Sequence, residues 1–109
     1  CPDPAANPYL VLAVCLEAGL DGIRNQITPP DAVTENVFEM QLQQRAKLGI
    51  ESLPGDLEQA VEELEKDDYI KNVLGGHITE KYLEAKRAEW ADYRAQVTEW
   101  EIEKYLYKI

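Results

Sequence analysis

The sequence has very few of the residues that perform nucleophilic and acid–base catalysis. Ser52 is the only serine and His77 the only histidine among 109 residues, so a Ser-His-acid triad would have to use this one pair. Nothing beyond their presence supports such a triad, and His77 fits a surface or capping position beside Gly75 and Gly76. That glycine pair lacks the lysine and hydroxyl residue of a phosphate-binding loop and predicts a helix end instead. On its own residues, the chain lacks a recognisable active site.

Cysteine is also scarce, since Cys1 and Cys15 are the only two. Two cysteines in this arrangement form neither a metal-binding motif nor a disulfide framework. Cys15 lies within an apolar run, where a free cysteine usually behaves as a small buried hydrophobic residue. We therefore expect a reducing, cytoplasmic compartment and no metal site in this chain.

Positive charge is in short supply, with 11 Lys and Arg against 21 Asp and Glu and a net charge of -10. Nucleic acids and anionic membrane surfaces both bind clustered basic residues, so we expect neither as a partner. Long hydrophobic runs are missing as well, because the longest charge-free stretch, residues 4–16, is too short to span a bilayer. Acidic Asp3 precedes this stretch where a signal peptide carries basic residues, which argues against a signal peptide.

What the sequence does have is helical periodicity, with 45% hydrophobic and 29% charged residues and no convincing strand. The first helix is predicted to begin at Asn7, a good N-cap followed by Pro8, and to end before residues 28–30. Its apolar residues from Tyr9 to Leu16 cover every face. A helix of this kind is buried all round, so we expect part of its cover to come from other chain.

Two helical regions are predicted in the middle of the chain. A short helix over residues 41–48 is expected to end at Gly49. Asp56 and Gln59 approximate a capping box for the next helix, which carries apolar side chains on one face and continues to Gly75.

Carboxylates follow one another closely on the opposite side of that helix. No glutamate stands three residues before His77, as a di-metal bundle would need, and the acids do not interrupt the apolar face. We expect these carboxylates to form a solvent-exposed acidic face. The last two, Asp67 and Asp68, also fit the start of a second helix. The members of the acidic face are Glu58, Glu62, Glu63, Glu65, Asp67 and Asp68.

The last predicted helix is long and amphipathic, with Leu83, Trp90 and Val97 recurring every seven residues. Thr98 and Glu101 form a capping box, so we expect a break there and a short terminal helix.

Aromatic residues gather in this final part of the chain. Trp and Tyr are typical of interfaces because they join a large apolar surface to a polar group. Trp90 and Tyr93 fit packing within the chain equally well. The candidate contacts with a neighbouring subunit are Trp100, Tyr105 and Tyr107.

Several stretches, taken in order, resemble bacterial glutamine synthetases. Residues 7–23, NPYLVLAVCLEAGLDGI, are similar to the helix that follows the last substrate-binding strand in that family. The likeness continues through ENVFEM, LGIESLPGDLEQAVEELEKDDYIKNVLG and EAKRAEWADYRAQVTEWEIEKYL and covers essentially the whole chain. The resemblance implies that residues 1–109 are the C-terminal helical part of the catalytic domain, without its sheet and active-site residues.

The resemblance also implies an activity. Glutamine synthetases make glutamine from glutamate, ammonia and ATP, with Mg or Mn ions, through a γ-glutamyl phosphate that ammonia attacks. The catalytic, metal and nucleotide residues would lie upstream of Cys1, so none is assigned in this segment, which we expect to be inactive alone. The implied partners are the rest of the enzyme chain and the neighbouring subunits of a dodecamer of two stacked rings, to whose contacts the C-terminal helices contribute.

One regulatory position can be compared with the family. Some relatives are switched off by adenylylation of a tyrosine in a KNLYDLP loop, and the corresponding stretch here is ENVFEMQ. Phe38 stands at the tyrosine position and has no hydroxyl nucleophile, so we expect no such modification there. We expect Phe38 to be a packed loop aromatic.

The predicted fold class is therefore all-α, with four or five helices that end in a long amphipathic one, as a fragment of a larger α+β catalytic domain. One alternative is a free-standing acidic helical module that binds a partner protein through the aromatic tail. A small complete enzyme is disfavoured for want of a site. The missing initiator Met before Cys1 and the bulky apolar first helix favour the enzyme segment. Exposed apolar surface should make the isolated segment self-associate.

Overall fold

The computed structural model describes residues 3–106, and this part of the chain is helical with no strand. The all-α prediction is confirmed. The elements are α1 (Pro8–Arg24), α2 (Leu42–Lys47), α3 (Leu57–Lys66), α4 (Asp68–Leu74), α5 (Gly76–Arg94), α6 (Glu99–Glu101) and a π-helix, η1 (Ile102–Leu106). None of these described helices has the length and apolar content needed to cross a membrane.

Two residues divide the middle of the chain into separate helices. Asp67 ends α3 and also caps α4, since its side chain accepts a hydrogen bond of 3.0 Å from the Ile70 N–H. Gly75 ends α4 with a φ of 79°, a left-handed conformation that glycine adopts without steric cost, and α5 begins at the next residue. The chain therefore turns sharply twice, which brings three helices together.

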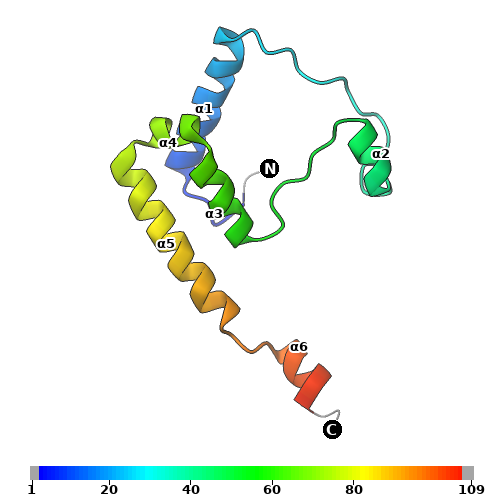
Figure 1. The fold of residues 1–109 in the computed structure, drawn as a ribbon, viewed down its shortest axis with the longest axis vertical. Coiled ribbons are helices and arrows are strands. Elements are labelled where there is room, and N and C mark those ends of the chain that lie inside the picture. Colours follow the sequence, from blue (N-terminus) through cyan, green and yellow to red (C-terminus); the bar gives the residue numbers. More distant parts are fainter. Residues whose placement is uncertain (1–2, 107–109) are drawn as a thin grey trace.

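Helices α3, α4 and α5 form one cluster, in which α3 and α5 run side by side in opposite directions (Figure 1). Val61 of α3 is buried in this cluster. Thr79 of α5 is also buried, and its hydroxyl donates a hydrogen bond of 3.2 Å to the Lys71 carbonyl oxygen at the end of α4. The core of the described part is small, and both of these residues belong to it.

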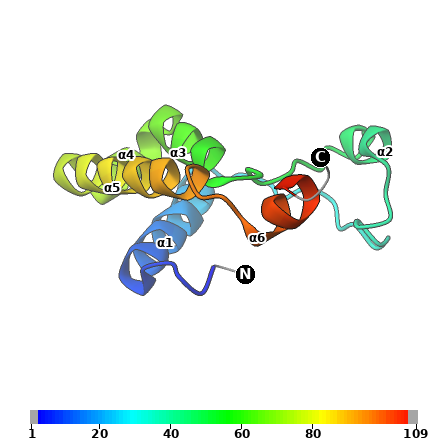
Figure 2. The same ribbon diagram turned by 90° about the horizontal axis from the view of Figure 1, so that it is seen from below.

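Helix α1 begins as predicted, because the Asn7 side chain accepts hydrogen bonds from the backbone N–H groups of Tyr9 and Leu10 at 3.0 and 3.4 Å. Among the described elements it packs against α4, which is much shorter, and it crosses the cluster obliquely (Figure 2). None of its residues is buried, so the expected burial on every face is not met within residues 3–106. Cys15 is exposed, which corrects its predicted burial, because α4 reaches only one side of α1.

Helix α2 lies apart from the other helices, at the end of two long connections (Figure 1). Gly49 follows it with a φ of 66° and ends it, as predicted. Met40, just before α2, is the buried residue of this region.

The chain ends in a short helical tail, α6 with η1, after a break at residues 95–98. The predicted capping box is confirmed, because Thr98 and Glu101 each accept from the other's backbone N–H, at 3.2 and 2.8 Å. Leu83 and Trp90 are half-buried along α5, but Val97 lies in the break and is exposed, so the predicted stripe ends at Trp90.

Candidate functional site

Ser52 and His77, the only serine and the only histidine of the sequence, do not form a catalytic pair in the described structure. Ser52 lies exposed in the loop before α3, and His77 lies exposed in the first turn of α5. No hydrogen bond joins them within residues 3–106. Their placement matches the interpretation of His77 as a surface residue beside the glycine pair.

The acidic residues of α3 and α4 are mostly solvated, as predicted. Glu63 forms an ion pair of 2.8 Å with Lys66, and Asp68 forms one of 2.7 Å with Lys71. The hydrogen bond from Lys71 and its charge hold the pKa of Asp68 below its ordinary value. Glu65 is half-buried and contacts Arg87 of α5.

No cluster of three or more His, Cys, Asp or Glu side chains in the described part could hold a metal ion. Asp56 and Asp67 cap helices, and Glu63 and Asp68 form ion pairs with lysines.

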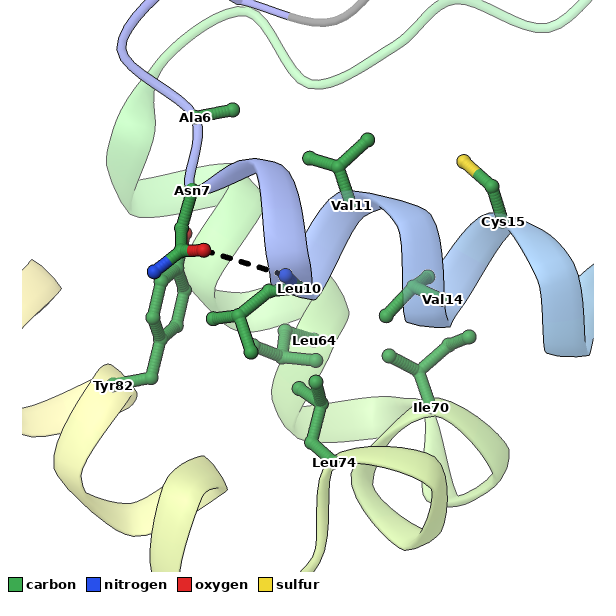
Figure 3. Close-up of a pocket in the computed structure, with 10 residues that line it drawn as sticks. All are labelled: Ala6, Asn7, Leu10, Val11, Val14, Cys15, Leu64, Ile70, Leu74 and Tyr82. Atoms are coloured by element: carbon green, nitrogen blue, oxygen red, sulfur yellow. Dashed lines mark hydrogen bonds between the residues drawn. The ribbon is translucent and has the colours of Figure 1, made fainter.

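A mostly apolar groove of about 260 Å³ lies at the junction of α1, α3, α4 and α5. Leu10 and Val14 of α1 point toward Leu64, Ile70 and Leu74 on its floor (Figure 3). Sequence reasoning did not find this groove, because its walls come from helices far apart in the chain.

Few polar groups reach the groove. The amide oxygen of Asn7 is already used by the helix cap, as the dashed bond to the Leu10 N–H shows (Figure 3). Cys15 and Tyr82 are the remaining polar side chains of the lining. Such a groove can hold an apolar side chain, but it offers no carboxylate or imidazole for acid–base work.

A hydrogen bond beside the groove joins its two sides. The hydroxyl of Tyr69 in α4 donates to the Glu17 carbonyl oxygen of α1 at 2.9 Å. Loss of solvation is the largest of several effects that raise the pKa of Tyr69, followed by the negative charges of Asp21 and Glu17. The phenol therefore stays protonated and remains a donor at neutral pH.

The predicted tail contacts are exposed where they are described. Trp100 and Tyr105 keep 60% and 64% of their surface in solvent. Their rings meet edge to face at 5.9 Å, and the Lys104 ammonium lies 5.9 Å from the Trp100 ring centre. Tyr107 lies outside the described residues. The tail thus presents an aromatic surface that residues 3–106 leave uncovered.

Trp90 packs within the chain, whereas Tyr93 keeps 67% of its surface in solvent. Trp90 is half-buried, lies beside Val61 in a groove between α3 and α5, and stacks on Tyr93 with ring centres 5.8 Å apart. The alternative of core packing, left open from the sequence, therefore describes Trp90.

Phe38 lies in the connection before α2, and 95% of its surface is exposed. The prediction that Phe38 packs within the loop is wrong for the described structure, because no helix of residues 3–106 lies against its ring. The Asn36 side chain accepts a hydrogen bond of 3.1 Å from the Phe38 N–H and shapes the loop locally.

Comparison with known proteins gives the family. A sequence model of the glutamine synthetase catalytic domain matches residues 1–105. Glutamine synthetases of Thermotoga maritima and Methanocaldococcus jannaschii are 53% and 51% identical over 106 and 105 residues, or 97% and 96% of this chain. That of Clostridium saccharobutylicum is 49% identical over 108 residues, or 99% of this chain.

These matches cover 24%, 23% and 24% of the three relatives, so the chain spans about a quarter of their length. The described residues are helical and contain no strand. The chain therefore belongs to the glutamine synthetase family, as a C-terminal segment of its catalytic domain.

Proposed function

We propose that residues 1–109 form the helical C-terminal segment of an enzyme that makes glutamine from glutamate, ammonia and ATP. The observation that carries the proposal is the match itself, which runs through 97% of this chain at 53% identity yet covers 24% of the relative. In this account the segment has a structural role and is inactive when separated from the rest of the enzyme.

The chemistry of the parent would be performed elsewhere in its chain. ATP and Mg or Mn would bind among residues upstream of Cys1, and the described residues here would contribute packing surfaces. Their carboxylates support this division, because they cap helices or pair with lysines, as Asp67 and Asp68 do. The parent would be a cytoplasmic dodecamer.

The tail would contact a neighbouring subunit of that dodecamer. Tryptophan and tyrosine side chains that are exposed on a free chain commonly lie at the buried centre of an interface once the partner binds. Trp100 and Tyr105 are exposed, and their edge-to-face contact gives them a defined shape before any partner binds. The same surface would serve the alternative, an acidic module that binds a different protein.

The proposal is tested by measuring glutamine formation by the complete enzyme, by the isolated 109-residue chain and by the enzyme with these residues deleted. We expect activity from the complete enzyme alone. Glutamine formation by the isolated chain would contradict the proposal, as would full activity of an enzyme that lacks the segment.

A further inference from the structure

We draw no further inference here: the strongest candidate, the groove between α3 and α5 beside Trp90, whose buried indole N–H has no hydrogen-bond acceptor within residues 3–106, carries none, because the Arg87 guanidinium in its lining already pairs with Glu65 and nothing in the structure shows what covers the groove.

Discussion

The hydroxyl of Tyr69 donates a hydrogen bond of 2.9 Å to the carbonyl oxygen of Glu17, 52 residues away in the sequence. This bond ties α4 to α1, a helix on which Tyr9, Leu12, Leu16 and Ile23 are exposed. The packing of α1 against α4 therefore includes this polar contact as well as the apolar side chains that line the groove.

Replacing Tyr69 by Phe removes the donor and keeps the ring. A hydrogen bond of this kind contributes about 0.5–1.5 kcal/mol, and the partly exposed site favours the lower end. We expect the amides of α1 to exchange with solvent about two- to threefold faster in the complete enzyme, measured by hydrogen-exchange mass spectrometry. Tyr82→Phe is the matched control, since both side chains are 37% exposed and the Tyr82 hydroxyl has no hydrogen bond within residues 3–106. Equal effects of the two substitutions would contradict the prediction.

Thr98→Ala should loosen the tail, because it removes the side-chain half of the capping box. Loss of an N-cap threonine costs about 1 kcal/mol, which corresponds to about fivefold faster cleavage of residues 99–106 by a protease that attacks the open form. Thr34→Ala, in an exposed loop without a helix cap, is the control. Limited proteolysis at neutral pH measures both, and cleavage at the wild-type rate in Thr98→Ala would refute the role of the cap.

The cap should also respond to pH. The backbone hydrogen bond from Thr98, and then the one from its hydroxyl, lower the pKa of Glu101 from its ordinary value of 4.5. Since the folded pKa is the lower one, the stabilisation is complete above pH 4.5 and is lost as the pH falls through the lowered value. An NMR titration of the Glu101 carboxyl should give a midpoint below 4.5 that rises in Thr98→Ala. A midpoint at or above 4.5 in the unaltered chain would be inconsistent with the cap.

Substituting both Trp100 and Tyr105 by Ala should weaken assembly of the complete enzyme. Buried interface aromatics commonly cost about 2 kcal/mol or more when truncated, or roughly 30-fold in the dissociation constant. Sedimentation velocity would show smaller species at concentrations where the unaltered enzyme stays assembled. Leu53→Ala, at an exposed loop residue outside the tail, serves as control. Unchanged sedimentation of the double variant would remove the tail from the interface.

The loop around Phe38 should carry no AMP in the native enzyme, because a phenyl ring offers no hydroxyl to receive it. Phe38 is 95% exposed in the described structure, so no packing within residues 3–106 shields it. Peptide mass spectrometry of residues 35–41 checks this directly. An adenylylated peptide would show that the comparison with the tyrosine loop is misplaced.

Features set by neighbouring residues could be predicted from the sequence. The Asn7 cap, the stop at Gly49 and the Thr98 capping box depend on side chains within four residues, and all three are confirmed. Asp56 likewise accepts from the Gln59 N–H at 2.9 Å, although the Gln59 side chain accepts from Gly55 rather than from Asp56.

Features that depend on contacts between distant parts of the chain could not be predicted from the sequence. The burial expected of Cys15 and Phe38 was wrong within the described residues, because it required partners that no local pattern specifies. The groove forms only where four helices, separated in the sequence, meet in the folded chain.

The measurement that bears most directly on the account is the mass of the native polypeptide that carries this sequence. Glutamine-forming activity would be purified from the source cells and its polypeptide identified by peptide mapping and intact mass. The account predicts that residues 1–109 are the C-terminal part of a chain several times heavier than 12.4 kDa, which copurifies with the activity. A native species of 12.4 kDa, separate from the activity, would contradict it.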